Sequence, residues 1–282
     1  MALPDGFDLD DFVRRTLAED LGSGGDVTSR ATIDVGARFT AEMRARQSLV
    51  LAGVDIAAAF FRALDSAVRV ELLASDGDRA EPGAVVMRLD GNARAMLAAE
   101  RSALNTLQHL SGIATLTRAY VDAIEGTGTV LLDTRKTIPG LRSLEKHAAR
   151  MGGAQNHRMR LDDGVLIKDN HVAVAGGVAE AVSRAKAADT GLQVQVEVDR
   201  IDQIAPALEA GADRLLLDNM NPMTLREAVR LVAGRVPLEA SGGVTLETIR
   251  AIAETAVDFI SVGRITQSAP AVDIGLDYSL TR

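Results

Sequence analysis

Cationic side chains are concentrated in residues 134–171. This stretch has eight Lys and Arg residues against four Asp and Glu residues, a net charge of 8 − 4 = +4 within a chain whose net charge is −8. A guanidinium grips a carboxylate or phosphate in two places at once, and lysine supplies a compact point charge. The stretch therefore predicts a site for an anion that carries several charges. The eight cations are Arg135, Lys136, Arg142, Lys146, Arg150, Arg158, Arg160 and Lys168.

Some of these residues have a simpler interpretation. Arg142, Lys146 and Arg150 are spaced four apart, which is equally typical of the solvent-exposed face of a helix. Three of the four histidines (His147, His157 and His171) lie in the same stretch, but a lone histidine is more often a structural residue. His157 and Arg158 therefore join the site on the argument of charge alone. Arg135, Lys136 and Lys168 are better candidates, because each follows a short apolar run that resembles a strand.

Two carboxylates, Glu197 and Asp218, end consecutive strand-like runs. They could simply pair with Lys168 and Arg135. The functional interpretation is a magnesium site, because Mg²⁺ prefers one or two carboxylates together with substrate phosphate oxygens.

Two glycine turns follow the last two apolar runs. Ser241-Gly242-Gly243 opens a helical segment, and Val262-Gly263-Arg264 ends the final run. Glycines there let backbone N–H groups approach a phosphate at a helix N-terminus. The last two strand-to-helix loops of barrel enzymes often hold phosphate, so these turns predict a phosphate subsite.

The elements that must position these residues form a repeating pattern from about residue 128. Short apolar runs alternate with helical segments at 178–188, 201–210, 222–233 and 245–256, which predicts a parallel sheet with right-handed crossovers. The six runs are 130–133, 165–168, 194–197, 214–218, 238–241 and 259–263. Six strands favour a partial or open α/β barrel over a complete one, and residues that end barrel strands face one mouth.

The first third of the chain has a different pattern. We expect a helix over 8–21, a glycine-rich loop over 22–26 and a helix over 54–64. Strand-like stretches occupy 38–51 and 68–90. Residues 92–124 are mainly helical, with an expected break near Ser111-Gly112, because Gly lowers helix propensity and Ser can cap a helix.

Composition excludes several classes of protein. The chain has no cysteine, which removes disulfides, thiolate metal sites and cysteine nucleophiles. Aromatic residues make up 3% and the net charge is negative, so nucleic-acid binding is not expected. No apolar run approaches the roughly 18 residues of a membrane span, and no signal peptide is evident. A cytoplasmic α/β enzyme is the expectation.

The motifs around these residues resemble the quinolinate phosphoribosyltransferase family over nearly the whole chain. Near the N-terminus the resemblance rests on Gly25-Asp26-Val27-Thr28 and Glu100-Arg101-Ser102-Ala103-Leu104-Asn105. Its strongest part is the run from Asp133 to Arg142, DTRKTIPGLR in one-letter code. The later motifs follow in order: Leu144-Glu145-Lys146, Gly152-Gly153-Ala154, Asn156-His157-Arg158, Leu166-Ile167-Lys168-Asp169-Asn170-His171, Glu197-Val198-Asp199, Leu217-Asp218-Asn219, Ser241-Gly242-Gly243 and Ser261-Val262-Gly263.

The resemblance implies a reaction on the route to NAD. Quinolinate and phosphoribosyl pyrophosphate would give nicotinate mononucleotide, CO₂ and pyrophosphate. It also implies an N-terminal α/β sandwich domain over 1–112, completed by 268–282, and an open, seven-stranded α/β barrel over 113–267. The family works as a homodimer whose sites are shared.

By the same resemblance, Arg135, His157, Arg158 and Lys168 would hold the two carboxylates of quinolinate, with Arg101 reaching in from the other subunit. Lys136 and Lys168 would contact the donor, and Glu197 and Asp218 its Mg²⁺. The two glycine turns would take the 5′-phosphate. The expected substrate-binding set is thus Arg101, Thr134, Arg135, Lys136, His157, Arg158, Lys168, Glu197, Asp218, Ser241, Gly242, Gly243, Val262, Gly263 and Arg264, with Lys136, Lys168, Glu197 and Asp218 as the catalytic group.

Three alternatives remain open from the sequence. One is a related phosphoribosyltransferase for another heterocycle, and a second is a barrel lyase that uses Lys168 to form a Schiff base. The third is an anion-binding module without catalysis.

Overall fold

The computed structural model describes residues 6–279, which form two compact units. The N-terminal unit contains the chain up to Leu116, together with Ser143–Gly152 and the segment that begins at Ser268. The barrel unit contains Thr117–Arg142 and Gly153–Gln267. The expected division at 112/113 and 267/268 differs mainly in one segment, since Ser143–Gly152 groups with the N-terminal unit. Residues 1–5 and 280–282 of the expected N-terminal domain lie outside the described residues.

The N-terminal unit is built on a four-stranded antiparallel sheet in the order β12-β1-β5-β3. One central strand (residues 38–45) buries alternate residues throughout, and the other (85–92) does so from Met87 onward, as a sheet covered on one face does. The C-terminal strand β12 (Ile274–Ser279) pairs with β1 (Arg38–Ala45), so the chain's end adds to the sheet of its beginning. The other strands are β2 (Leu49–Val50), β3 (Arg69–Leu72), β4 (Arg79–Ala80) and β5 (Val85–Asn92).

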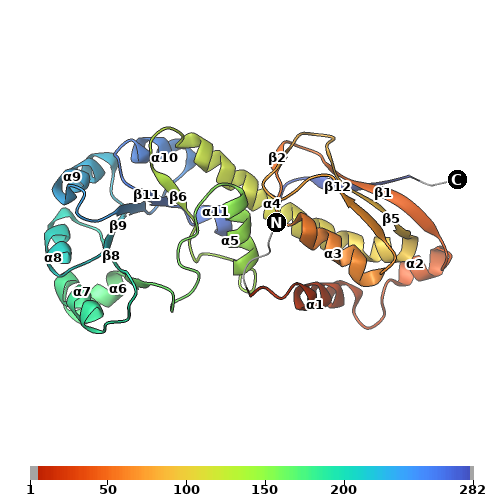
Figure 1. Ribbon diagram of the computed structural model, residues 1–282, viewed down its shortest axis with the longest axis horizontal. Coiled ribbons are helices and arrows are strands. Elements are labelled where there is room, and N and C mark those ends of the chain that lie inside the picture. Colours follow the sequence, from red (N-terminus) through yellow and green to blue (C-terminus); the bar gives the residue numbers. More distant parts are fainter. Residues whose placement is uncertain (1–5, 280–282) are drawn as a thin grey trace. The chain divides into compact units, whose positions relative to one another are not determined.

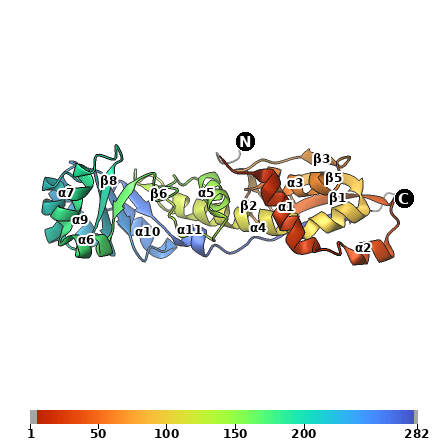
Figure 2. The same ribbon diagram turned by 90° about the horizontal axis from the view of Figure 1, so that it is seen from below.

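Helices complete this unit: α1 (Leu9–Leu21), α2 (Val27–Thr32), α3 (Val54–Leu64), α4 (Ala93–Ala123) as far as Leu116, and α5 (Arg142–Met151) from Ser143 onward. The first and third confirm the helices expected over 8–21 and 54–64. Asp8 caps α1 by accepting a hydrogen bond from the Asp11 backbone amide, a common helix start. Helix α1 packs against α3 (Figure 2). Phe12 of α1 meets Phe60 of α3 edge-on, with ring centroids 6.0 Å apart.

Helix α4 is continuous through Ser111 and Gly112, so the expected break is wrong. Ser111 is fully buried, and its hydroxyl accepts a hydrogen bond from the Ala52 amide at 3.1 Å. Gly112 lies against the C-terminal segment, where an added Cβ would stand 2.2 Å from the Pro270 carbonyl oxygen. Tertiary contacts explain both residue types at these positions, and neither residue marks a helix end.

This close approach predicts an inverted effect for Gly112→Ala. The substitution would ordinarily stabilise a helix interior by about 1 kcal/mol. Here the methyl group must displace the Pro270 backbone, so we expect the free energy of unfolding to fall by about 1–3 kcal/mol. Thermal or urea denaturation measures it, with Gly36→Ala as control because no atom lies within 4 Å of its added Cβ. Stabilisation by Gly112→Ala would contradict this packing.

Helix α5 buries polar residues instead of exposing them. Glu145, Lys146 and His147 are all at most 3% exposed, so the solvated helix face, one of the two interpretations of Arg142, Lys146 and Arg150, is wrong at its central residue. Glu145 lies 2.9 Å from His109 Nε2 of α4. His147 Nε2 lies 2.7 Å from Asp76 Oδ2. These contacts attach α5 to the rest of the N-terminal unit.

Asp76 links α5 to α3, because its Oδ1 accepts hydrogen bonds from the Gly53 and Val54 amides at 2.8 and 2.9 Å. Burial works to raise the pKa of Asp76, but the hydrogen bonds from His147 and from these amides hold it below its ordinary value of 3.8. A carboxyl with a lowered folded-state pKa stabilises fully above its unfolded-state pKa, and that stabilisation is lost as the pH falls through the folded-state value.

Asp76→Asn should therefore destabilise the protein at neutral pH by about 1–3 kcal/mol, the usual cost of disturbing a buried charged hydrogen bond. The difference from the wild type should shrink as the pH falls below about 4. Urea denaturation at a series of pH values measures this, with the exposed Asp34→Asn as control. A difference that stays constant down to pH 3 would disprove the role of the Asp76 charge.

The barrel unit confirms all six expected strands and their parallel arrangement, in the order β6-β11-β10-β9-β8-β7. The resemblance implies seven strands. The structure has six strands and, in place of the seventh, a single bridge. Gln155 pairs with Leu132 in parallel at the free edge of β6. The barrel is open between that bridge and β7. The strands are β6 (Val130–Leu132), β7 (Val165–Ile167), β8 (Val194–Val198), β9 (Arg214–Asp218), β10 (Leu238–Ser241) and β11 (Phe259–Ser261).

Helices follow these strands and cover the outer side of the sheet, as the arc of α7 to α10 shows (Figure 1). The bounds of the four helical segments expected at 178–188, 201–210, 222–233 and 245–256 are met within three residues, whereas α6 and α11 were not expected. They are α6 (Asp169–Ala175), α7 (Val178–Ala187), the 3₁₀ turn Ile201–Gln203 with α8 (Ile204–Glu209), α9 (Pro222–Val232), α10 (Leu246–Ala253) and α11 (Arg264–Gln267). Among the described residues, no helix is both long and apolar enough to cross a membrane.

Candidate active site

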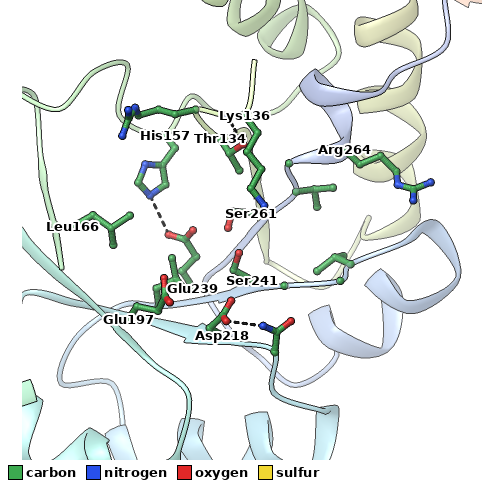
Figure 3. A pocket seen from close by; sticks show the side chains of 18 of the residues that line it. Thr134, Lys136, His157, Leu166, Glu197, Asp218, Glu239, Ser241, Ser261 and Arg264 are labelled. Atoms are coloured by element: carbon green, nitrogen blue, oxygen red, sulfur yellow. Dashed lines mark hydrogen bonds and ion pairs between the residues drawn. The ribbon is translucent and has the colours of Figure 1, made fainter. Parts of the chain in front are cut away.

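A cavity of about 710 Å³ opens where the barrel strands end (Figure 3). Fourteen of the fifteen residues expected to bind substrate line it. They come from the ends of all six strands and the loops that follow, as barrel geometry predicts. The fourteen are Thr134, Arg135, Lys136, His157, Arg158, Lys168, Glu197, Asp218, Ser241, Gly242, Gly243, Val262, Gly263 and Arg264.

Arg101 is the exception. It is exposed on α4 and belongs to the N-terminal unit, whereas every residue of the cavity belongs to the barrel unit. The part expected of it, reaching a second subunit's site, remains a proposal.

The cationic stretch 134–171 divides between two places. Arg135, Lys136, Arg158 and Lys168 line the cavity, whereas the other four cations of the stretch do not. Lys146 is buried in the N-terminal unit, and Arg160 pairs with Asp162 at 3.0 Å on the surface. Four cations around one cavity still suffice for an anion with several charges.

Two guanidinium groups, Arg135 and Arg158, lie near each other in this wall. Burial and the positive charge of Arg135 lower the pKa of Arg158. Arg158 Nη1 donates to the Gly164 carbonyl at 2.8 Å, which fixes the side chain. An anion bound between the two groups would relieve their repulsion, so the electrostatics favour occupation by a carboxylate or phosphate.

Lys136 passes directly over the final glycine turn. A Cβ on Gly263 would stand 2.7 Å from Lys136 Cδ, so this position must be glycine for the lysine to take its path. The Lys136 carbonyl accepts a hydrogen bond from the Thr266 hydroxyl at 2.8 Å, and its amide donates to Thr134 Oγ1 at 3.0 Å. In Figure 3 the Lys136 side chain extends toward Ser261, whereas Arg264 points away from the cavity's centre.

The two predicted carboxylates have different partners. Lys168 Nζ lies 3.1 Å from Glu197 Oε2, so one of the simple pairings considered from the sequence is present. Asp218 instead accepts a hydrogen bond from the Asn219 amide group at 2.6 Å. Both carboxylates line the cavity together with Lys168, whose side chain is 52% exposed to it and to solvent.

This donor set fits Mg²⁺ bound jointly with a substrate. Among the described residues, no group of three or more His, Cys, Asp or Glu gathers to hold a metal. Two carboxylates beside a cavity are the protein share that Mg²⁺ takes when substrate phosphate oxygens and water supply the rest. Glu197 and Asp218 would be those ligands.

Asn219 connects the first glycine turn to Asp218 by hydrogen bonds to both. Asn219 has a left-handed backbone with φ of 54°, and its backbone N–H donates to the Ser241 carbonyl at 2.9 Å. Gly242 has φ of 94°, and a Cβ there would stand 2.2 Å from Asn219 Oδ1. The turn therefore tolerates no side chain at Gly242, and its backbone is open to a phosphate.

A buried carboxylate also supports the segment that carries His157 and Arg158. Asp133 is fully buried and accepts hydrogen bonds from the His157 amide at 2.8 Å and from Asn156 Nδ2 at 2.5 Å. Asp133 directly follows β6, so it anchors the loop of the neighbouring bridge to the sheet.

Sequence reasoning missed several residues of this cavity, above all Glu239 and Asn219. Glu239 is a fully buried acid within the apolar strand β10. A charged residue inside a buried parallel strand was the available signal, because such a charge is rare without a partner. Asn219 had no comparable signal, since its backbone conformation cannot be read from its type. The others are Leu166, Asp169, Leu216, Val244, Thr245, Ser261 and Gln267.

An open parallel barrel whose mouth combines cations, two carboxylates and glycine turns defines a class of enzyme that binds phosphorylated polyanions. Comparison with known proteins narrows the class. The family model described as "Quinolinate phosphoribosyl transferase, N-terminal domain" matches residues 26–111, and that of the C-terminal domain matches residues 113–277.

Relatives match over nearly their full length. The nicotinate-nucleotide pyrophosphorylase [carboxylating] of Mycobacterium leprae is 43% identical, over 95% of this chain and 96% of that protein. The probable enzyme of the same name from Bacillus subtilis is 42% identical, over 93% and 91%. The solved structure of the nicotinate-nucleotide pyrophosphorylase from Francisella tularensis superposes with a TM-score of 0.93 at 41% identity, covering 99% of this chain and all of that one. The chain belongs to the quinolinate phosphoribosyltransferase family.

Proposed function

We propose that this protein transfers the phosphoribosyl group of phosphoribosyl pyrophosphate to quinolinate, giving nicotinate mononucleotide, CO₂ and pyrophosphate. The observation that carries the proposal is the gathering of fourteen expected site residues around one cavity in a chain that belongs to this family. Quinolinate brings two carboxylates and the donor several phosphate charges, so both substrates need the basic wall found there.

The donor would occupy the side of the cavity formed by β9, β10 and β11. The turns at Gly242 and Gly263 would take its 5′-phosphate on backbone N–H groups. Lys136 and Lys168 would contact its pyrophosphate. Glu197 and Asp218 would hold Mg²⁺ there, and the ion when bound would supply positive charge to the departing pyrophosphate.

The acceptor would lie against the wall of Arg135, His157 and Arg158, with Lys168 between the two substrates. These cations would hold the two carboxylates and aim the ring nitrogen at the ribose carbon C1. Orientation of this kind lowers the barrier by removing the entropy cost of the encounter.

The bond-breaking and bond-forming steps that follow depend on positively charged side chains more than on a general base. The C1–oxygen bond breaks with its electron pair going to pyrophosphate, and C1 becomes cation-like. The ring nitrogen then forms the new bond to C1. The adjacent carboxylate leaves as CO₂, its bonding electrons are taken up by the cationic ring, and the ring carbon accepts a proton. Fixed positive side chains stabilise the charge that develops on pyrophosphate.

The ion pair of Lys168 with Glu197 supports this role over that of a Schiff-base lysine, which is usually desolvated to make its amine nucleophilic. The proposal also includes a homodimer in which Arg101 completes the partner's site. It includes a cytoplasmic location, since a chain without cysteine needs no oxidising compartment.

The test is incubation with quinolinate, donor and Mg²⁺, followed by chromatography for nicotinate mononucleotide. The mononucleotide should form, and nicotinate in place of quinolinate should be used at least about a hundredfold less well, because it lacks a carboxylate that pairs with the cations of the cavity. Equal use of nicotinate would point to a related transferase for another heterocycle. Trapping of a carbonyl substrate by borohydride would point to the lyase.

A further inference from the structure

Glu239 places a negative charge at the floor of the cavity. It lies in the middle of β10, lines the cavity, and is fully buried. A carboxylate removed from water costs several kcal/mol unless charged or hydrogen-bonding partners compensate it. Its partners therefore show what the residue is for.

Three side chains converge on one oxygen of this carboxylate. Arg214 Nη2 lies 2.7 Å from Glu239 Oε2, and Gln195 Nε2 donates to the same oxygen at 2.8 Å. His157 Nε2 lies 3.4 Å from it, on the side of the cavity (Figure 3). The Arg214 guanidinium also packs on the Phe259 ring, with 3.9 Å from Cζ to the ring centroid. Glu239 thus connects a fixed arginine at the start of β9 with the imidazole at the mouth.

The charge of Glu239 persists at neutral pH. Burial works to raise the pKa of its carboxyl, but the hydrogen bond from His157 and the positive charge of Arg214 hold it below the ordinary value of 4.5. Arg214 and His157 are the titratable groups that face it.

The hydrogen bonds of His157 determine which ring nitrogen carries the proton. The backbone amide of Arg158 donates to His157 Nδ1 at 2.8 Å, so Nδ1 is an acceptor and carries no proton. The neutral ring therefore carries its proton on Nε2, which points at Glu239 Oε2 and lies 3.2 Å from Gln195 Oε1. The imidazole is held at both nitrogens.

We propose that Glu239 is a positioning residue for the acceptor: together with Gln195 it holds the His157 ring in one orientation and tautomer, so that the imidazole forms a fixed wall beside Arg135 and Arg158. This rests on the proposed function, because it assigns the acceptor to that wall. Without the carboxylate the ring can rotate about its side-chain bonds, and acceptor binding weakens. The donor subsite depends on the backbone N–H groups of the glycine turns and not on the imidazole, so donor binding should be unaffected.

The test measures the two substrates separately in Glu239→Gln, which keeps the size of the side chain and removes its charge. We expect the KM for quinolinate to rise at least about tenfold, the worth of one lost charged hydrogen bond, with the KM for the donor within about twofold. Equal changes in both KM values, or an unchanged KM for quinolinate, would overturn the proposal.

Two further variants separate positioning from stability. Thr129→Val removes buried hydrogen bonds to the Ala253 and Val257 carbonyls, far along the barrel strands from the cavity. It should lower stability and leave both KM values unchanged. If Glu239→Gln fails to fold because Arg214 loses its partner, Glu239→Gln combined with Arg214→Gln removes both charges together and should show the same selective effect on quinolinate.

NMR spectroscopy reports the tautomer of the His157 ring independently of catalysis. In ¹⁵N-histidine-labelled protein, assigned with His157→Asn, the wild type should show Nδ1 unprotonated and Nε2 protonated, and Glu239→Gln should change both shifts. A proton on Nδ1 in the wild type would overturn the proposal. Titration with quinolinate alone distinguishes the levels of failure: no binding to the wild type counts against the proposed function, whereas equal binding to wild type and Glu239→Gln counts against the role of Glu239.

Discussion

Lys168→Ala should reduce kcat/KM at least about 10²–10³-fold while the protein remains folded. Lys168 directly follows β7, at the point between the proposed donor and acceptor, and its ammonium group is 3.1 Å from Glu197. Its loss removes a positive charge aimed at the departing pyrophosphate, and removal of one such preorganised group typically has this effect. It also leaves Glu197, whose side chain is 11% exposed, without its cation.

Lys186→Ala is the matched control for this change. Lys186 pairs with Asp213 at 3.0 Å, so its removal also breaks a lysine–carboxylate pair of the barrel unit. It does not line the cavity and should leave turnover within about twofold, since exposed pairs contribute little. Steady-state kinetics with circular dichroism on both variants decides the matter. Near-normal turnover in folded Lys168→Ala would exclude the assigned role.

Gly242→Ala should be nearly as damaging, through the donor. The new Cβ would stand 2.2 Å from Asn219 Oδ1 and 2.9 Å from the Asn219 amide nitrogen. The turn must therefore open or Asn219 must move, and Asn219 holds Asp218 by its 2.6 Å hydrogen bond. We expect kcat/KM for the donor to fall about a hundredfold, the cost of a displacement near 1 Å at a reacting site, and the Mg²⁺ requirement to rise.

Gly234→Ala is the control that separates backbone strain from the steric clash with Asn219. Gly234 also has a left-handed backbone, with φ of 74°, but nothing lies within 4 Å of its added Cβ. It should therefore cost about 1–2 kcal/mol of stability, as any L-residue in that conformation does, without affecting the donor. If Gly242→Ala behaves like Gly234→Ala, the close contact with Asn219 does not organise the donor site.

Much of the fold and the site could be predicted from the sequence, because barrel strands are short apolar runs that end in the residues that face the mouth. Asp218 and Lys168 were located in this way, since each follows such a run directly. The break expected at Ser111-Gly112 was wrong for the opposite reason: a tertiary contact with Pro270 decided a local feature. Lys146 was misplaced because helical spacing does not show which face is buried.

The parts of the site that could not be predicted depend on contacts between segments that are far apart in the sequence. Glu239 and His157 are 82 positions apart in the chain, and only the closing of β10 beside β9 and β11 brings the acid beneath the imidazole. Asparagine tolerates the left-handed conformation that Asn219 adopts, but nothing in the sequence shows that this asparagine adopts it or that it lies against Gly242. The seventh strand of the barrel is reduced to the Gln155 bridge, which no periodicity of the sequence marks.

The central claim is that phosphoribosyl transfer to the ring nitrogen releases the neighbouring carboxylate. The most direct measurement uses quinolinate labelled with ¹³C in the carboxylate next to that nitrogen, with donor and Mg²⁺ present. The label should appear as CO₂ in a one-to-one ratio with pyrophosphate, and none should be released when the donor is omitted. Label retained in the nucleotide product, or CO₂ released without the donor, would contradict the account.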